Sequence, residues 1–406
     1  IWNRIQPYLW ERALIKQERK QKMKRTKWIA FLCFAFLMAG LGANDALRGI
    51  FAPVFQERYD LNGSQLSLIV TISYVGNLLF LSIGGKLLDL FPRKNVAVAV
   101  TAVWAGAVAL NLVSDSYIWI LVSMFFALGA STLLNTTVNI LTPAVFAGYA
   151  GLMVNVLFFI QGIGTSGSQL LLGRYAFHYA GWKWINAALL AVAFLVIVLF
   201  FFLKIPKQGE EKEQEKEILK KEPDSKIFWI FIAMMGCYFI GEHGIMNWLM
   251  SYCISAFSME ASSASASLSL FWGGMTAGRL MFAPVVQKMG AVKSMKLFGG
   301  IGTVMFCAGC ILGESGVWVL GASGFALAIL YPTMVLLIQQ IYPVQTAATR
   351  TGVIISAATV ADIVFNLLFG AVSSKWGYGI SFMILPVAMA VFYGLYLRLA
   401  RSLKRN

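Results

Sequence analysis

An acidic side chain, an amide and a guanidinium group lie within one long apolar stretch of this sequence. Asn44, Asp45 and Arg48 interrupt a hydrophobic run that begins near Trp28. Ionisable groups at membrane depth are costly, and they usually face a bundle interior or a water-filled pathway for a substrate or a proton. Asp45 is therefore a candidate functional residue. The alternative is that Asp45 pairs with Arg48, one helical turn away, and only stabilises the end of its helix.

The composition places these residues in a membrane protein. Of the 406 residues, 59% are hydrophobic and only 13% are charged, whereas about a quarter of a typical globular chain is charged. A membrane-crossing helix needs roughly 18 or more apolar residues in sequence. Twelve such helices are expected, at residues 28–55, 65–89, 95–114, 117–142, 149–174, 181–204, 227–256, 262–288, 292–313, 317–341, 350–374 and 378–400, with Gly162, Pro284 and Pro332 interrupting the runs.

The net charge of +15 follows the membrane topology and does not indicate nucleic-acid binding. Basic residues gather in residues 1–27, at Arg93 and Lys94, in residues 288–296 and in residues 401–406. All these segments lie on one side if the helices alternate in direction. The positive-inside rule therefore predicts cytoplasmic N- and C-termini in a multi-pass plasma-membrane protein.

A charge-rich segment divides the chain into two halves. Residues 205–226 interleave glutamates and lysines, which is typical of a solvated linker. We expect a six-helix bundle in residues 28–204 and another in residues 227–400. Residues 1–27 are expected to form a basic cytoplasmic arm, and residues 401–406 a cytoplasmic tail. The predicted fold is an all-α membrane protein with two pseudo-symmetric six-helix halves.

The two halves repeat each other at offsets of about 198 to 201 residues. Matching positions include Trp119 and Trp318, Gln161 and Asp362, and Asn44-Asp45 and Glu242-His243. Parallel repeats of this kind occur in transporters, where the ligand lies between the halves near the midplane of the membrane. Polar residues at matching positions, above all Asp45, Gln161, Glu242 and Asp362, are therefore expected to line one cavity.

The segment from Gly85 to Lys94 resembles the signature G-x-L-x-D-R-x-G-R-R/K of the major facilitator superfamily. Leu90 and Pro92 replace the usual Arg and Gly. The resemblance implies a gating role for Asp89, which can pair with a cation or cap the other half at the cytoplasmic end. Arg93 and Lys94 would anchor the loop at anionic headgroups. The alternative is a charge cluster that only sets topology.

A narrower resemblance is to the fucose-proton symporter branch of that superfamily. It rests on Asn44-Asp45, Pro53, Phe55, Asn155, Gln161, Cys237-Tyr238, Glu242 and Tyr331-Pro332-Thr333. It implies proton-coupled sugar uptake. Fucose-type members carry a second carboxylate in helix 4, where this chain has Ser131 and Thr132 beside Asn135.

The candidate site residues fall into three groups. Proton coupling is assigned to Asp45, Glu242, His243 and Asp362. Substrate binding is assigned to Asn44, Asn135, Asn155, Gln161, Asn247, Trp248, Tyr331 and Gln339, and gating to Asp89, Arg93 and Lys94. For the amides, hydrogen bonding between helices is the alternative. For the aromatic residues, the alternative is packing.

The predicted function is secondary active transport by alternating access, with proton-coupled uptake of a small polar organic solute such as a sugar. The expected partners are that solute, protons and membrane lipids, for a monomer that binds no nucleic acid. A proton-driven exporter of drugs or metabolites on the same fold is one alternative, and a membrane receptor or enzyme is another. No cofactor, metal or catalytic site is expected, because no nucleotide loop or metal-ligand cluster is present. The five cysteines are expected to be small core residues.

Overall fold

The computed structural model describes residues 2–146, 150–175, 178–203 and 224–403 of the chain. Side chains are described throughout these ranges except for residues 2–25, Asp89, Ala150, Gly151, Val344, Gln345 and Ala348. Most of the linker predicted at 205–226, and nearly all side chains of the predicted arm 1–27, therefore lie outside the described residues.

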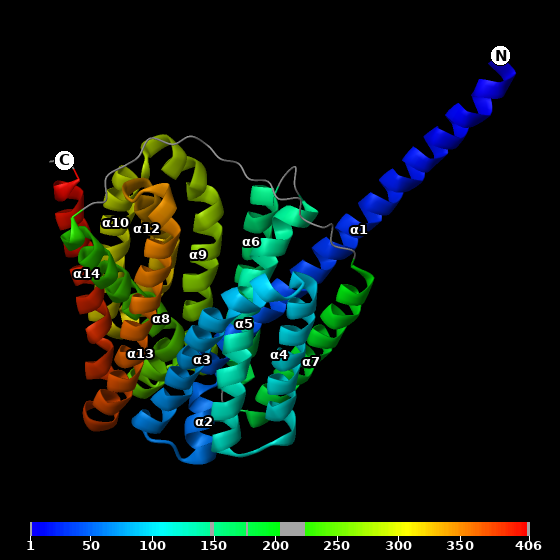
Figure 1. Cartoon of the computed structure of the whole chain (residues 1–406). Coiled ribbons are helices and arrows are strands. Elements are labelled where there is room, and N and C mark those ends of the chain that lie inside the picture. Colours follow the sequence, from blue (N-terminus) through cyan, green and yellow to red (C-terminus); the bar gives the residue numbers. More distant parts are fainter. Residues whose placement is uncertain (1, 147–149, 176–177, 204–223, 404–406) are drawn as a thin grey trace.

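Helices make up almost all of the described chain (Figure 1). The first half contains α1 (Trp2–Ile50), α2 (Ala52–Tyr59), α3 (Gly63–Leu90), α4 (Arg93–Val113), α5 (Tyr117–Val145), α6 (Ala150–Leu172), the 3-10 helix η2 (Gly173–Tyr175) and α7 (Tyr179–Phe202). The second half contains α8 (Ser225–Phe257), α9 (Ala261–Met289), α10 (Ala291–Ile311), the 3-10 helix η3 (Gly313–Gly316), α11 (Val317–Leu327), α12 (Leu330–Ile341), α13 (Val344–Phe382) and α14 (Ile384–Ser402).

Eleven helical segments of the described chain are long and apolar enough to cross a membrane. The helix α9 is not among them, because its first half, Ala261-Ser-Ser-Ala-Ser-Ala-Ser-Leu-Ser269, is rich in serine. It nevertheless has 29 residues and packs against α6, α8 and α11. With α9 included, the described residues make twelve crossings, in which α11 and α12 together form one. The predicted twelve-helix fold is confirmed.

The two halves have matching internal packing. In the first half, α1 packs on α6, α3 on α5, and α4 on both α5 and α7. In the second half, α8 packs on α13, α9 on α11, and α10 on both α11 and α14. Each pair in one half corresponds to a pair in the other, as the sequence repeat predicts.

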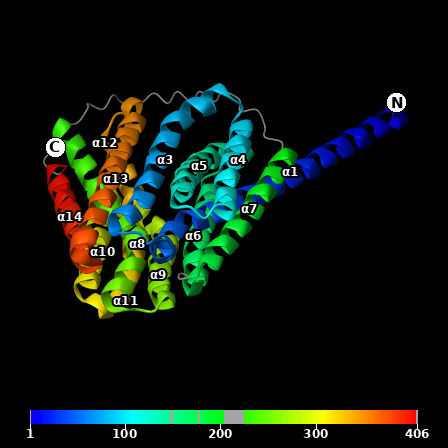
Figure 2. The same ribbon diagram turned by 90° about the horizontal axis from the view of Figure 1, so that it is seen from below.

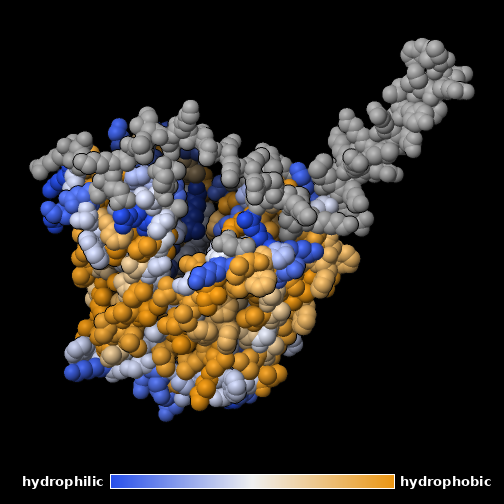
Figure 3. All heavy atoms as spheres, viewed as in Figure 1, coloured by the Kyte–Doolittle hydropathy of each residue, from blue (hydrophilic) through white to orange (hydrophobic). Residues whose placement is uncertain are grey.

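Both ends of the chain lie on the same side of the bundle (Figure 1). We call this side the terminal face and the opposite side, which includes the α2–α3 and α8–α9 connections, the far face. Figure 2, which views the molecule from below, shows α3 beside α13 and α6 beside α9 along the line between the halves. Figure 3 shows a hollow between the halves that opens on the terminal face.

Small residues close the far face. The backbone N–H of Ser64 donates to the hydroxyl of Ser374 across the halves, at 2.9 Å. The hydroxyl of Ser269 donates to the backbone oxygen of Ser166 at 2.7 Å. At Gly49, an added Cβ would collide with the carbonyl oxygen of Met246 in the other half. The conformation is therefore closed on the far face and open on the terminal face.

Only one of the three predicted interruptions breaks a helix. The helices α6 and α9 run through Gly162 and Pro284, whereas the chain leaves helical order between α11 and α12, just before Pro332. Proline has no N–H, so Pro332 leaves the carbonyl of Ala328, four residues earlier, without its helical donor. This carbonyl becomes important in the site described below.

Candidate functional site

Asp45 lies against α5 and does not pair with Arg48. Its carboxylate accepts a hydrogen bond from the Ser131 hydroxyl at 2.8 Å and another from the Asn44 amide at 3.3 Å. The side-chain oxygen of Asn44 accepts a hydrogen bond from the Trp104 indole N–H at 3.1 Å. The described residues contain no Asp45–Arg48 ion pair. The alternative in which the two side chains pair along their helix is therefore wrong for this conformation.

Arg48 instead crosses from the first half to the second. Its Nε donates to the side-chain oxygen of Asn247 at 2.7 Å, and its Nη2 donates to the Tyr74 hydroxyl at 3.0 Å. The guanidinium also stacks over the Tyr74 ring, 4.6 Å from its centroid. Arg48 and Asn247 are 199 residues apart, close to the repeat offset. The two positions are within one residue of equivalence in the repeat and touch, so they lie near the pseudo-twofold axis.

His243 and Asp362 meet in the second half. The His243 Nδ1 and the Asp362 Oδ2 are 2.6 Å apart, and the Asp362 side chain is fully buried. The Asn366 amide donates to the other carboxylate oxygen of Asp362 at 3.0 Å. The His243 ring stacks on Tyr74, with 5.4 Å between the ring centroids. Two predicted proton-coupling residues thus form one pair that touches the first half through Tyr74.

Asn247, which is part of this network, and Trp248 beside it are packed inside the bundle rather than exposed in an open site. Both are fully buried. The Trp248 indole donates to Asn366 at 2.8 Å, and its ring stacks on Phe369 at 4.5 Å. Trp248 was predicted to contact substrate, but in this conformation it has no surface for a ligand. It packs the second half together instead.

The predicted residues of the first half also contact one another. The Asn135 amide donates to Gln161 at 3.2 Å, and Asn139 donates to Asn135 at 3.4 Å. Asn135 and Gln161 are both half-buried. An added Cβ at Gly42 would collide with the Gln161 carbonyl oxygen, so α1 and α6 approach closely here.

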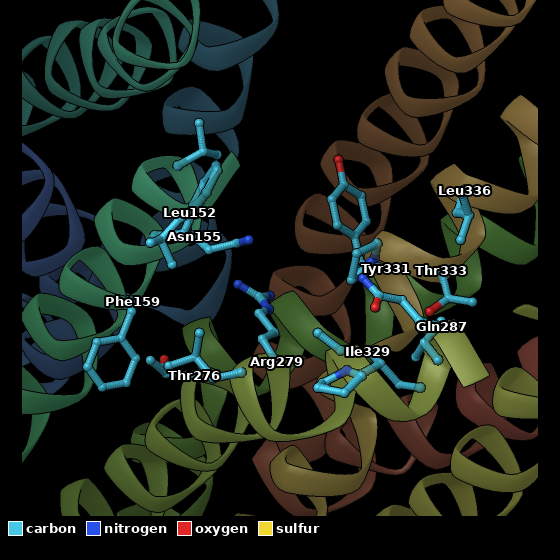
Figure 4. A pocket seen from close by; sticks show the side chains of 17 residues that line it. Leu152, Asn155, Phe159, Thr276, Arg279, Gln287, Ile329, Tyr331, Thr333 and Leu336 are labelled. Atoms are coloured by element: carbon cyan, nitrogen blue, oxygen red, sulfur yellow. The ribbon is translucent and has the colours of Figure 1, made fainter. Parts of the chain in front are cut away.

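A cavity of about 550 Å³ lies between α6, α9 and α12 (Figure 4). The predicted substrate residues Asn155 and Tyr331 line it. Gln339 is exposed farther along α12 and is outside the lining. Arg279, which also lines the cavity, was missed as a site residue. The available signal was a cation inside an otherwise uncharged stretch of α9.

Glu242 and His243 point to different neighbours, as expected for adjacent helical residues about 100° apart. Glu242 is buried and faces α9, where one of its carboxylate oxygens is 3.8 Å from the Arg279 Nη2. His243 faces α13 and Asp362. The four residues Asp45, Gln161, Glu242 and Asp362 do not line one open cavity in this conformation, because Asp362 has no exposed surface. None of the four lines the 550 Å³ cavity.

The predicted gating residues lie at the start of α4 and the end of α3. The Asp89 side chain is outside the described residues, so its role stays a prediction. Arg93 is half-buried. The Lys94 ammonium donates to the Leu203 carbonyl at 2.7 Å, at the end of α7. Lys94 therefore binds backbone within its own half, and its anchoring at lipid headgroups stays a prediction.

Two six-helix halves with buried charged side chains between them define the architecture of a secondary transporter. The family model of the Major Facilitator Superfamily matches residues 28–361, and the chain belongs to this family.

Curated relatives and solved structures share this architecture at low sequence identity. The chain is 22% identical over 385 residues to the "Protein TsgA homolog" of Yersinia enterocolitica, covering 92% of each sequence. A crystal structure of a mutant of the nucleoside transporter NupG superposes with a TM-score of 0.71 at 11% identity, covering 92% of this chain and 99% of that one. The transporter FucP in its outward conformation superposes with a TM-score of 0.63 at 17% identity, with the same coverages.

Proposed function

We propose that this member of the superfamily couples proton movement to the uptake of a small organic solute by alternating access. The observation that carries the proposal is the polar network between the halves. Arg48 binds Asn247 and Tyr74, and Tyr74 stacks on His243, which pairs with Asp362. A proton gained or lost at this pair therefore acts directly on the contacts that join the two halves.

The charges of this network support proton coupling. Its described ionisable groups are Arg48, His243 and Asp362, of which Asp362 is fully buried and Arg48 nearly so. Because an unbalanced buried charge is costly, a proton gained or lost at the His243–Asp362 pair changes the free energy of this closed arrangement.

The observed conformation, closed on the far face and open on the terminal face, corresponds to one end state of an alternating-access cycle. With the termini in the cytoplasm, the open terminal face makes this the inward-open state, and the serine and glycine contacts form the outer gate. Opening the far face requires Arg48 to leave Asn247 and His243 to leave Tyr74. Loss of the proton from His243 or Asp362 changes the charge balance beside these contacts, which provides a physical link between protonation and opening.

Export is the second candidate function. The apolar lining of the 550 Å³ cavity, with Phe158, Phe159 and Leu280, favours a solute with a hydrophobic part. A proton-driven exporter would collect such a solute from the open terminal face.

Transport by proteoliposomes with and without an imposed pH gradient tests the proposal, with a mixed metabolite pool as substrate. We expect gradient-dependent accumulation of a small organic solute by the unmodified protein and none by Asp362→Asn. Gradient-driven expulsion would instead support export. Full accumulation by Asp362→Asn would remove the His243–Asp362 pair from the coupling mechanism.

A further inference from the structure

Arg279 places a cation deep inside the cavity between α6, α9 and α12. It lies ten residues before Met289, where α9 ends, which corresponds to about 15 Å along the helix axis. That depth is about half of a hydrocarbon core of roughly 30 Å. The side chain keeps 37% of its surface exposed. A charge at this depth usually marks a substrate or ion pathway.

The break between α11 and α12 holds the guanidinium in place. The Arg279 Nε lies 3.4 Å from the Ala328 carbonyl oxygen, which lacks a helical donor because Pro332 has no N–H. This contact uses the Nε and leaves the two Nη groups directed elsewhere. Figure 4 shows the Arg279 side chain projecting into the cavity toward Asn155 of α6.

Arg279 forms only a long ion pair with Glu242, its counter-ion within the protein. The Nη2 of Arg279 is 3.8 Å from the nearest Glu242 oxygen, whereas a charge-assisted hydrogen bond is about 2.7 to 2.9 Å long. Glu242 is itself buried and does not line the cavity. The guanidinium therefore keeps donors that face the cavity and can bind a second anion.

The rest of the lining is neutral and largely apolar. Among the described residues that surround the cavity, Arg279 is the one charged side chain. Apolar surface comes from Leu152, Phe158, Phe159, Leu280, Ile329 and Leu336. Small-molecule sites typically combine such surface with a few polar groups that orient the ligand, in volumes of about 300 to 1,000 Å³.

We propose that this cavity binds an amphipathic organic anion, whose carboxylate engages Arg279 and whose hydrophobic body contacts Phe158 and Leu280. Glu242 is the internal anion with which the ligand competes for the guanidinium. The inference rests on the proposed transport function and specifies its substrate class. The proposed substrate is thus a water-soluble organic carboxylate rather than an uncharged sugar.

Binding to the purified, full-length protein in detergent tests the assignment without any proton gradient. The probes are 3-phenylpropionate and its neutral amide, 3-phenylpropionamide, which have the same hydrophobic body. We expect the unmodified protein to bind the carboxylate at least about tenfold more tightly than the amide, since a guanidinium binds a carboxylate through charge-assisted hydrogen bonds that are stronger than those it donates to a neutral amide oxygen.

Three variants assign this preference to Arg279. Arg279→Gln should remove the preference for the carboxylate. Glu242→Gln should tighten carboxylate binding severalfold without changing amide binding, because it removes the competing anion. Lys288→Gln removes a positive charge from the same helix outside the cavity lining, and it should leave both affinities unchanged.

Several results would overturn the inference. These are equal affinity for the two probes, weaker carboxylate binding by Glu242→Gln, or an equal loss in Lys288→Gln and Arg279→Gln. Arg279-dependent binding of oleate from neutral phosphatidylcholine vesicles, with no binding of 3-phenylpropionate, would show that the anion comes from the bilayer and not from water. Because these measurements need no gradient, binding can succeed while proton coupling fails, or the reverse.

Discussion

At the scale of single residues, the charged groups at the centre of the bundle mostly find partners on other helices. Arg48 binds Asn247 and Tyr74, Asp45 binds Ser131, and His243 meets Asp362. Interactions at three- or four-residue spacing on one helix contribute only about 0.2 to 0.5 kcal/mol. A buried partner on another helix satisfies a desolvated group more completely, so it determines where these side chains point.

We predict that Asp45→Asn abolishes gradient-driven accumulation but leaves part of the counterflow exchange. Asn keeps an oxygen that can accept from Ser131, so the local packing should survive while the ionisable group is lost. Uptake with a pH gradient and exchange without one separate the two effects. Ser131→Ala is the matched control, because it removes the hydrogen bond and keeps the carboxylate. Normal accumulation by Asp45→Asn would exclude Asp45 as a coupling group.

At the scale of elements, two lysines join α4 and α7 at both ends. Lys94, near the start of α4, donates to the Leu203 carbonyl just after α7. Lys183, near the start of α7, donates to the carbonyls of Leu112 and Ser114 at 3.0 and 3.2 Å, at the end of α4. Cations stabilise the C-terminal ends of helices, where carbonyls lack helical donors. The two antiparallel helices therefore cap each other reciprocally.

We predict that Lys94→Met and Lys183→Met each lower the free energy of unfolding by about 0.3 to 1 kcal/mol, as measured by unfolding in detergent. Lys293→Met, at an exposed position near the start of α10, should have a smaller effect. Loss of transport by Lys94→Met with unchanged stability would instead favour the gating role implied by the family signature.

Asp115, in the connection between α4 and α5, makes the Lys183 contact between α4 and α7 pH-dependent. Its carboxylate accepts from the Lys183 ammonium at 2.6 Å and from the Tyr179 hydroxyl at 2.9 Å. These hydrogen bonds, led by that from Lys183, hold the pKa of Asp115 below its ordinary value of 3.8. A lowered pKa in the folded state stabilises the protein above the unfolded-state pKa, and this stabilisation is lost as the pH falls through the folded-state value.

We therefore predict that Asp115→Asn unfolds at a lower temperature than the unmodified protein at pH 7, by a small margin because the Asp115 side chain is 56% exposed to solvent. The difference should shrink as the pH falls below about 4. Melting temperatures of both proteins at pH 7 and pH 3 measure it. A difference that stays constant with pH would show that the carboxylate charge contributes nothing.

At the scale of the whole molecule, the far face closes through small residues that let backbones of opposite halves touch. The hydroxyls of Ser64 in α3 and Ser374 in α13 are 3.4 Å apart. Because Gly49 has no side chain, the Met246 carbonyl of the other half can approach its backbone closely. Contacts of this kind are short and fit only one arrangement of the two halves, so they should separate together when the far face opens.

We predict that the double variant Ser64→Cys/Ser374→Cys forms a disulfide under mild oxidation and locks the far face closed. Transport should fall to background and return after reduction, because alternation needs this contact to open. The single variants Ser64→Cys and Ser374→Cys control for the substitutions themselves. Normal transport by fully cross-linked protein would contradict a gating role for the contact.

The sequence alone determines much of this architecture. Apolar run lengths predict the twelve crossings, because a bilayer of fixed thickness demands helices of a minimum length. The repeat between Gln161 and Asp362, and between Asp45 and His243, predicts that the halves pack alike. Both signals are local or periodic, so they can be recognised without knowing which helices are neighbours.

Only the tertiary structure decides which partner each polar side chain takes. Arg48 is three residues from Asp45 but binds Asn247, 199 residues away. Trp248 is buried against Phe369, and Arg279 faces a cavity beside a carbonyl left without its helical donor by Pro332. A side chain's surroundings depend on how two separate helices rotate and approach, and neither residue type nor spacing along one helix contains that information.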